Sequence, residues 1–185
     1  MSFYNPRDFA KDKYKRIDRP PYAGGPGMVI QAEPVIHAIE KAKSNKRNIK
    51  IIFLAPSGKQ FTNSYAANVA RKYKDIVIVC GRYEGVDARV KKVFRMDEIS
   101  VGPFILTGGE LPAMIILDCL ARQVPGVLGN FDSIEERRVS SSEIYTRPEV
   151  FVYKGKKYRV PKILLSGHRA NIEKWKKEKD GVDKK

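Results

Sequence analysis

Two short, continuously apolar segments with a helical pattern between them restrict this chain to a small set of folds. The segments IKIIFLA (49–55) and DIVIVC (75–80) are rich in Ile and Val. Such runs are typical of strands that are buried on both faces of a sheet. Residues 63–73, between them, have the composition and spacing of a helix. Strands that alternate with helices form parallel sheets covered on both faces, so we expect an α/β fold.

The same alternation continues on either side of this unit. Residues 33–43 space Val and Ile as a helix does, and residues 110–123 form a strongly apolar helix before a Pro-Gly pair. EISVG (98–102) predicts a third short strand. Residues 1–30 contain so many Pro and Gly that we expect them to be irregular.

After Gly129 the sequence becomes polar and weakly patterned, which predicts a change of domain. A hairpin in residues 151–167 and a helix in residues 171–179 are expected beyond it. The predicted division is a main domain, a linker and a small C-terminal unit: 1–129, 130–145 and 146–185.

The charge of the chain favours an anionic partner. Lys and Arg number 36 against 21 Asp and Glu, which gives a formal charge of +15. Such an excess points to nucleic acid or an anionic membrane, although a basic solubility surface or the lysine-rich tail would also contribute to it. No apolar run approaches the length of a membrane span, and no signal-peptide pattern opens the chain, so we expect a cytoplasmic protein.

The metal-ligating residue types are too sparse to predict a zinc site. Cys80 and Cys119 form no CxxC pair, and His37 and His168 are far apart. Each cysteine lies in an apolar run, so we expect two buried, reduced thiols.

Each predicted strand ends in a turn that contains Gly or Pro: APSG (55–58), GRYEG (81–85) and VGPFILTGGE (101–110). In parallel sheets, ligands bind outside the carboxyl ends of the strands. Glycine there lets the backbone approach a ligand closely, so three such loops predict one pocket lined by backbone atoms. The alternative is that glycine only punctuates the loops. The phosphate-binding patterns GxxxxGK[ST] and GxGxxG are absent at the strand ends.

Six strings carry a resemblance that covers nearly the whole chain: RPPYAGGPGM, IFLAPSGKQ, VCGRYEGVDAR, ISVGPFILTGGELPAMIILD, PGVLGN and YTRPEV. In this order they resemble the bacterial tRNA (guanine-N1)-methyltransferases. The resemblance implies a SPOUT-type parallel sheet with a deep trefoil knot, and a homodimer whose active sites use both subunits. It also implies S-adenosylmethionine as methyl donor and guanosine 37 of tRNA as substrate, with magnesium left possible.

The sequence departs from the family pattern at both ends. The family has a strand and a helix before the segment that matches FYNPRDF, so we expect the sheet to lack the usual first strand. Further tRNA-binding helices follow LLSGHRANIEKW in the family, which makes the predicted C-terminal unit a partial tRNA-binding domain. An inactive tRNA-binding remnant and a knotted methyltransferase with another RNA target are the alternative interpretations.

The resemblance assigns the methyl donor to the three glycine-containing loops, mostly through backbone groups and apolar packing. The assigned residues are Leu54, Pro56, Gly58, Gly81, Tyr83, Ile99, Val101, Gly102, Phe104, Leu106, Gly108, Gly109 and Pro112.

Methylation of guanine N1 requires removal of a proton, so the site needs a base near N1 and a cation near O6. The resemblance makes Arg122 the catalytic arginine and places Glu84 at the edge of the guanine. An ion pair between Asp118 and Arg122, or a turn in which Glu84 pairs with Arg82 or Arg89, would be the structural alternatives.

The general base is expected in the linker. The family has an aspartate there, in an acidic-Asp-Ser-Phe context, whereas counting from PGVLG places Arg137 at its position in this chain. Glu136 is the carboxylate that we predict for this role, with Glu135 and Asp132 as alternatives.

Overall fold

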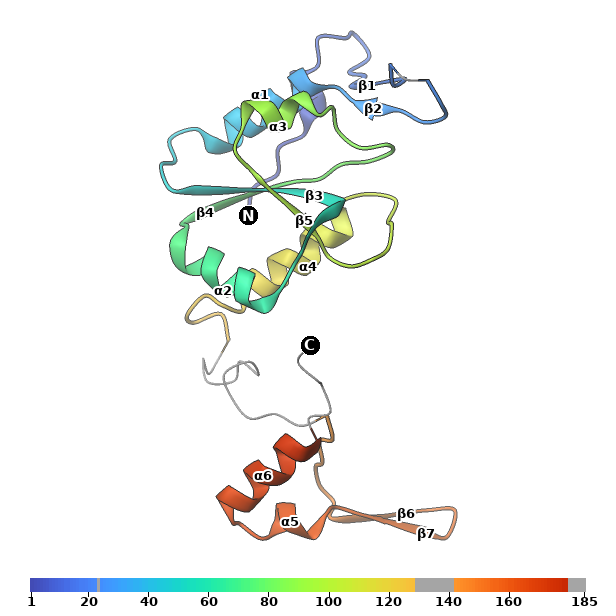
Figure 1. Cartoon of the computed structure of the whole chain (residues 1–185), viewed down its shortest axis with the longest axis vertical. Coiled ribbons are helices and arrows are strands. Elements are labelled where there is room, and N and C mark those ends of the chain that lie inside the picture. The colour runs from blue at the N-terminus through green and yellow to red at the C-terminus, as the bar shows by residue number, and fades with distance from the viewer. Residues whose placement is uncertain (23, 129–141, 180–185) are drawn as a thin grey trace. The chain divides into compact units, whose positions relative to one another are not determined.

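The computed structural model describes residues 1–22, 24–128 and 142–179. The chain divides into two compact units, Met1–Val127 and Leu128–Lys185, each considered by itself (Figure 1). The predicted end of the main domain at Gly129 and most of the predicted linker lie outside the described residues.

A parallel sheet forms the centre of the first unit. The long strand β3 (Ile49–Gln60) lies between β4 (Asp75–Val79) and β5 (Asp97–Ser100), and it pairs with both in parallel. The sequence-based prediction of a parallel α/β sheet is therefore confirmed. Because the strands run in one direction, the loops that follow them emerge at one edge.

Helices cover both faces of this sheet. Figure 1 shows α1 (Ala32–Lys43) and α3 (Arg89–Val93) on one face, and α2 (Asn63–Lys72) and α4 (Glu110–Ala121) on the other. The sequence pattern did not predict α3, which is only five residues long. The other three helices lie where the apolar spacing placed them.

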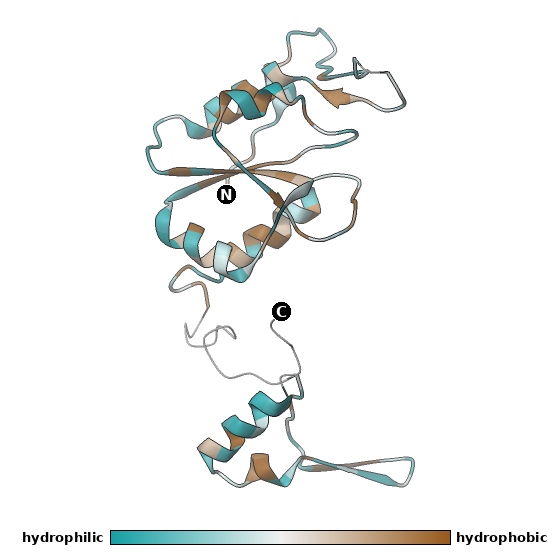
Figure 2. Ribbon diagram, viewed as in Figure 1, coloured by the Kyte–Doolittle hydropathy of each residue, from teal (hydrophilic) through white to brown (hydrophobic). Residues whose placement is uncertain are grey.

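Alternate residues of β3 supply the two hydrophobic cores. Ile51 and Phe53 belong to the core under α1 and α3, whereas Ile52 and Leu54 belong to the core under α2 and α4. Ile52 has no solvent-exposed surface. Figure 2 shows the apolar colour concentrated on the sheet and on the inner helix faces. Burial on both faces explains why the strand is apolar without interruption.

The start of α2 is fixed by a side-chain cap. The hydroxyl of Thr62 accepts a hydrogen bond from the amide of Tyr65 at 3.2 Å. Asn63 and Ser64, the polar residues that follow, lie inside the helix. Threonine satisfies an amide that the first turn otherwise leaves without a partner.

Strand β3 does not end at Ala55, as the sequence predicted. It continues to Gln60, but its register against β5 jumps, so that Leu54 and Lys59 both pair with Ile99. The residues between them leave the ladder and return to it. The Pro-Ser-Gly segment is thus an excursion within one strand, and the prediction that it terminates the strand was wrong.

The N-terminal thirty residues carry only short elements. A 3₁₀ turn covers Pro6–Phe9, and the two-residue strands β1 (Asp18–Arg19) and β2 (Val29–Ile30) pair antiparallel. Dense Pro and Gly shorten these elements, although the segment is more ordered than the sequence predicted.

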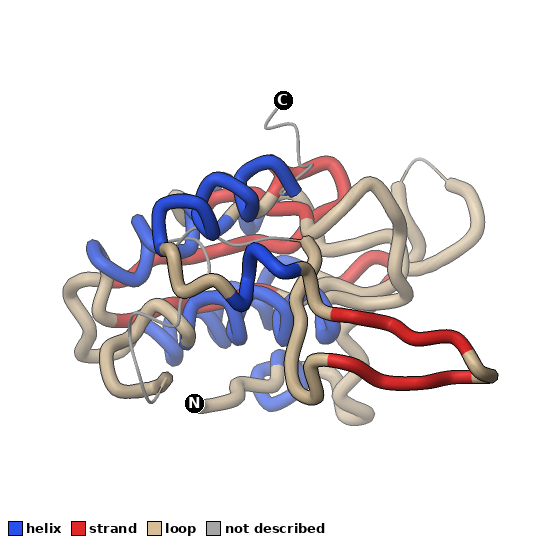
Figure 3. The backbone as a smooth tube through the Cα atoms, turned by 90° about the horizontal axis from the view of Figure 1, so that it is seen from below, coloured by secondary structure: helices blue, strands red, loops and turns tan. Residues whose placement is uncertain are grey.

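The second unit contains a hairpin and two helices. Strands β6 (Val150–Tyr153) and β7 (Lys156–Arg159) pair antiparallel, and α5 (Lys162–Leu165) and α6 (Arg169–Lys179) follow. Figure 3 shows the hairpin as two paired strands that extend from the helices. The predicted hairpin is confirmed only as far as Arg159, because Lys162–Leu165, which the prediction included in it, form α5. The predicted last helix is confirmed.

Candidate functional site

The three glycine-containing loops come together at one edge of the sheet. The amide of Gly109 donates a hydrogen bond to the carbonyl of Gly81 at 2.9 Å, and Arg82 forms an isolated antiparallel bridge with Gly108. Gly58 approaches the backbone of Ile99, at the end of β5. The loops after β4 and β5 are therefore in direct contact, and the segment of β3 that contains Gly58 packs on β5 beside them.

Close backbone approach explains two of these glycines. A Cβ atom on Gly58 would lie 2.6 Å from the amide nitrogen of Ile99, and one on Gly109 would lie 2.8 Å from Cα of Cys80. Both contacts involve main-chain atoms that cannot move aside. At these positions glycine joins one loop to another, which is a structural role. Close approach does not explain Gly81, because the nearest contact of a Cβ atom there would be with Val86 Cγ2 at 3.5 Å, an ordinary van der Waals distance.

The loop after β5 presents both apolar surface and open backbone donors. The side chains of Phe104 and Leu106 are 52% and 39% exposed. The amides of Phe104, Ile105 and Leu106 donate no hydrogen bond to another described residue. Unpaired amides beside exposed apolar groups suit a ligand that has both a polar edge and a flat apolar face.

Ser100 holds the first turn of this loop. Its hydroxyl donates to the carbonyl of Gly102 at 2.9 Å, and the amide of Gly102 approaches the same oxygen at 3.3 Å. The ring of Phe104 lies so close to Gly102 that a Cβ atom there would overlap it. The sequence analysis missed Ser100, although a hydroxyl residue at the end of a buried strand is a recognisable signal for such a turn.

Of the predicted donor-binding side chains, several belong to the protein interior. Leu54 and Ile99 are core residues with 8% and 1% exposure, and Pro112 is buried in the first turn of α4. Only their backbones, or the edges of their side chains, can face a ligand. Tyr83 lies in the loop after β4 with a positive φ of 58° and is 58% exposed.

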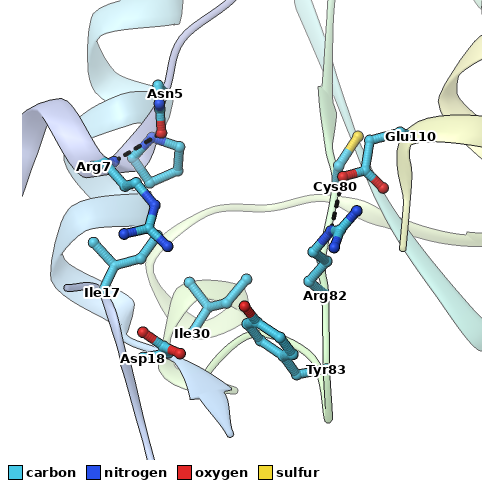
Figure 4. Close-up of a pocket in the computed structure, with 11 residues that line it drawn as sticks. Asn5, Arg7, Ile17, Asp18, Ile30, Cys80, Arg82, Tyr83 and Glu110 are labelled. Atoms are coloured by element: carbon cyan, nitrogen blue, oxygen red, sulfur yellow. Dashed lines mark hydrogen bonds and ion pairs between the residues drawn. The ribbon is translucent and has the colours of Figure 1, made fainter. Parts of the chain in front are cut away.

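A pocket of about 240 Å³ opens beside the loop after β4 (Figure 4). It shares only Gly81 and Tyr83 with the predicted donor site, and its volume is below the roughly 300–1,000 Å³ of ligand pockets. We therefore regard it as a neighbour of the loop cluster. Its lining residues are Asn5, Pro6, Arg7, Ile17, Asp18, Ile30, Cys80, Gly81, Arg82, Tyr83 and Glu110.

An ion pair joins the loop after β4 to the start of α4 in this pocket. Arg82 Nε lies 3.1 Å from Glu110 Oε1. The pKa of Glu110 is lowered first by its own backbone amide and then by Arg82. A carboxylate at a helix N-terminus is stabilised in its charged form. The charged Glu110 then holds Arg82, and this ion pair links the loop after β4 to the start of α4. Neither residue was predicted as part of the site.

Cys80 lies in the pocket wall and is exposed, which corrects the prediction of a buried cysteine. Partial burial of the thiol and the nearby charge of Glu110 raise the pKa of Cys80 to about 11. Cys119, a residue of α4, is half-buried, so it too is less buried than predicted.

A backbone hydrogen bond positions Glu84, and its side chain lies against Gly27. Its amide donates to the carbonyl of Met28 at 3.1 Å, and a Cβ on Gly27 would come within 2.7 Å of its Oε1 atom. The arginines that might have paired with it bind other carboxylates: Arg82 contacts Glu110, and Arg89 contacts Asp87 at 2.6 Å. The side chain of Glu84 is exposed.

Arg122 is not near the loop cluster of its own chain. It is the C-cap of α4, and its amide donates to the carbonyl of Asp118 at 3.1 Å. Helix α4 has 12 residues and begins directly after Gly109. At 1.5 Å per residue, the helix separates the two ends by about 18 Å. Glu136, Glu135 and Asp132 lie outside the described residues.

The described residues contain neither a candidate metal-ion site nor a candidate membrane-spanning helix. No group of three or more His, Cys, Asp or Glu side chains among them is arranged to hold a metal ion. None of the described helices combines the length and hydropathy that crossing a bilayer requires.

Comparison with known proteins gives a consistent result. The profile of the family described as tRNA (Guanine-1)-methyltransferase TrmD matches residues 1–184. A tRNA (guanine-N(1)-)-methyltransferase of Caldanaerobacter subterraneus is 46% identical over 183 residues, which cover 97% of this chain and 73% of that protein. Proteins of the same name from Desulforamulus reducens and Buchnera aphidicola are 45% and 42% identical, over 94% and 95% of this chain and 68% and 74% of their own lengths.

Proposed function

The chain belongs to the tRNA (guanine-1)-methyltransferase family, and from this we infer that it transfers a methyl group from S-adenosylmethionine to N1 of guanosine 37 in tRNA. The observation that carries this inference is the cluster of three loops at the carboxyl edge of the sheet, in a chain that matches the family over residues 1–184. Because tRNA is the proposed substrate, we place the protein in the cytoplasm.

The loop after β5 supports the assignment of the donor site. The unpaired amides of Phe104, Ile105 and Leu106 can hydrogen-bond to the polar edge of an adenine or to a ribose, while the exposed Phe104 and Leu106 side chains supply apolar surface. Gly81 and Tyr83 border the same cluster. When bound, the donor supplies a methyl group that its sulfonium already activates.

The protein must then handle the proton of guanine N1. As this proton leaves, negative charge builds on O6, and a guanidinium stabilises that charge because it stays protonated and offers several donors. We assign this task to Arg122. Glu84, whose carboxylate is exposed beside the loop after β4, binds the guanine edge. Glu136 is our candidate for the base that accepts the proton.

The distance between Arg122 and the loop cluster supports a site shared between two chains. A single chain separates Gly109 from Arg122 by the length of α4. A second copy in a homodimer can bring its own arginine to the cluster, and the two sites are then equivalent by symmetry.

Helix α4 offers a surface for this dimer. Leu111, Met114 and Ile115 form a stripe at helical spacing and are 60%, 64% and 46% exposed. The opposite side of the helix is buried against the sheet through Ile116 and Leu120. An exposed apolar stripe on a helix is stabilised when another surface buries it, and a second α4 or its surroundings would bury this one.

The contacts between the loops also support the proposed knot. Gly109 is fixed to Gly81, and Gly58 is packed on Ile99. The chain between β5 and α4 is thus held against the end of β4, a contact that a chain threaded through a loop would also make. We further propose residues 1–129 as the SPOUT methyltransferase domain and residues 146–185 as a partial tRNA-binding domain.

The test is methyl transfer from labelled S-adenosylmethionine to an unmodified tRNA that carries G at position 37, compared with the same tRNA carrying A. We expect label only on the G form, and none with the variant Arg122→Ala. Tight, salt-dependent binding of tRNA without transfer would instead identify an RNA-binding remnant. Omitting magnesium in a parallel reaction tests whether the ion takes part.

A further inference from the structure

The hairpin of the second unit carries an aromatic face. Phe151 and Tyr158 are cross-strand partners, and their rings stack with centroids 5.1 Å apart and planes inclined by 12°. Tyr153 pairs with Lys156 two positions along. Because side chains alternate across a strand, these four residues lie on one face of the hairpin.

This face is exposed to solvent. Phe151, Tyr153 and Tyr158 are 54%, 58% and 40% exposed. Hairpin stability accounts for only part of the pattern. A stacked cross-strand pair stabilises a hairpin, which explains Phe151 and Tyr158. It leaves Tyr153 unexplained, since this tyrosine faces a lysine.

The hairpin is also strongly basic. Residues 150–159 contain Lys154, Lys156, Lys157 and Arg159 and no acidic residue. The ammonium of Lys154 lies 5.5 Å from the ring centre of Tyr153, and that of Lys156 lies 5.4 Å from the ring centre of Tyr158. Cations and aromatic rings thus alternate on a scale of a few ångströms.

Two classes of partner can bind an aromatic surface, and the charge distinguishes them. A protein partner would need a matching acidic surface, and a second copy of this basic hairpin would repel it. RNA offers phosphates for the cations and flat bases for the rings together. Within RNA, only unpaired nucleotides expose base faces, because a duplex stacks them internally.

We propose that the β6–β7 hairpin binds unpaired nucleotides of the tRNA, with Tyr153 and the Phe151–Tyr158 pair as stacking surfaces. Lys154 and Lys156, which lie over the Tyr153 and Tyr158 rings, are the phosphate contacts. This rests on the proposed function for the identity of the RNA. The hairpin then supplies affinity for the substrate from the second unit.

The experiment measures tRNA binding by the full chain in fluorescence anisotropy, with an unmodified tRNA transcript as probe. Tyr153→Val removes the ring and keeps a residue that favours strands. We expect affinity to fall about five-fold or more, because stacking of one base is worth roughly 1–3 kcal/mol. The slope of log K against log salt should stay constant.

The lysines give a separate signature. The double variant Lys154→Gln with Lys156→Gln should also bind less tightly, and the salt slope should fall by about 1.4 to 1.8, at roughly 0.7–0.9 per phosphate contact. Tyr153→Phe keeps the ring and should bind as the wild type does. Val152→Thr, on the opposite face of the hairpin and 60% exposed, is the matched control.

A second probe tests whether the bases must be unpaired. The same tRNA with its anticodon loop paired to a complementary oligonucleotide should no longer distinguish Tyr153→Val from the wild type, if that loop supplies the stacked bases. If another single-stranded segment supplies them, oligonucleotides against the other loops will abolish the difference. A difference that survives pairing of every loop would contradict the proposal.

Other outcomes would also overturn the proposal. Wild-type affinity of Tyr153→Val would contradict the proposal. A loss of affinity equal to that of Val152→Thr would also contradict it, since equal losses would indicate a structural effect. A change of oligomeric state with Tyr153→Val would indicate a protein contact instead. Binding is measured without methyl transfer, so a chain that binds tRNA through Tyr153 yet transfers no methyl group refutes the enzyme assignment alone.

Discussion

The amide of Gly109 donates a hydrogen bond to the carbonyl of Gly81 at 2.9 Å, and this bond fixes the start of α4 to the end of β4. The two residues are far apart in the sequence, yet they bring the second and third loops of the candidate site into contact. The pair Arg82–Glu110 reinforces the same junction from the side chains. The proposed donor-binding site is therefore built by contacts between distant segments, two of which require glycine.

Gly58→Ala should damage the fold itself. The added methyl group would lie 2.6 Å from the amide nitrogen of Ile99 and 2.7 Å from the carbonyl carbon of Glu98. Relief requires the two strands to separate, which we expect to lower the free energy of unfolding by about 1–3 kcal/mol or more. Urea denaturation followed by circular dichroism measures the change.

Gly81→Ala is the matched control, because its methyl group would make only ordinary contacts, with Val86 Cγ2 at 3.5 Å and Gly85 Cα at 3.8 Å. Its unfolding midpoint should stay close to that of the wild type. Equal destabilisation of both variants would show that the close approach of Gly58 to Ile99 is not what selects glycine there.

Two inactive variants should restore activity to each other. If each site combines Glu84 of one subunit with Arg122 of the other, a heterodimer of Glu84→Gln and Arg122→Ala contains one site with both residues intact. Statistical mixing then gives about a quarter of the wild-type activity. The measurement is methyl transfer after the two proteins are unfolded and refolded together.

The control is the double variant Glu84→Gln with Arg122→Ala, refolded with either single variant. No intact site can form in those mixtures, and they should stay inactive. Inactivity of the complementing mixture as well, despite confirmed heterodimers, would place both residues in the same subunit's site.

Met114→Glu should separate the dimer without unfolding the subunit. The side chain is 64% exposed on the outer stripe of α4, so a charge there costs the single chain little. In a dimer interface the same charge would be buried without a partner, which is strongly unfavourable. Light scattering after size-exclusion chromatography should show a monomer.

Val93→Glu provides the comparison. Val93 is 55% exposed at the end of α3, on the other face of the sheet. This variant should keep the oligomeric state of the wild type. Dissociation by Val93→Glu, with Met114→Glu unchanged, would move the interface to the α1 and α3 face.

The thiol of Cys80 should react slowly at pH 8. Its pKa is raised to about 11, from an ordinary value near 9, so the reactive thiolate is roughly 100-fold less abundant than for an unperturbed thiol at this pH. The folded state holds this proton more tightly than the unfolded state does, so the protonated thiol stabilises the fold. This stabilisation is complete below pH 9 and is lost as the pH rises through about 11.

Alkylation by iodoacetamide in a Cys119→Ser background, followed by mass spectrometry from pH 8 to 10.5, measures this directly. The rate should still be rising at pH 10.5. A rate that levels off near pH 9 would mean that neither burial nor Glu110 perturbs the thiol.

Local composition was sufficient to predict much of the fold. The runs 49–55 and 75–80 became strands because their residues fit a position buried on both faces, and the apolar spacing of α1 and α4 matched the core that they cover. Helix α3 could not be found this way, since five residues make too little of a periodic pattern.

The features that sequence could not provide depend on contacts between distant segments. Nothing local shows that β3 returns to β5 after Gly58, or that Gly58 is needed because Ile99 lies against it. The predicted donor residues were assigned as a group, yet Leu54 and Ile99 are core residues in the fold. The separation of Arg122 from the loops follows from the direction of α4, which only the structure gives.

The double pairing of Ile99 has a consequence for how this protein can vary. Leu54 and Lys59 meet the same residue of β5, so the four residues between them act as a spacer of fixed length. Apart from Gly58, side chains in that spacer can change without moving either strand. One residue more or fewer would turn the second half of β3 over, exchanging its inward and outward groups. We expect sequence drift here to proceed by replacement, while insertions and deletions are eliminated.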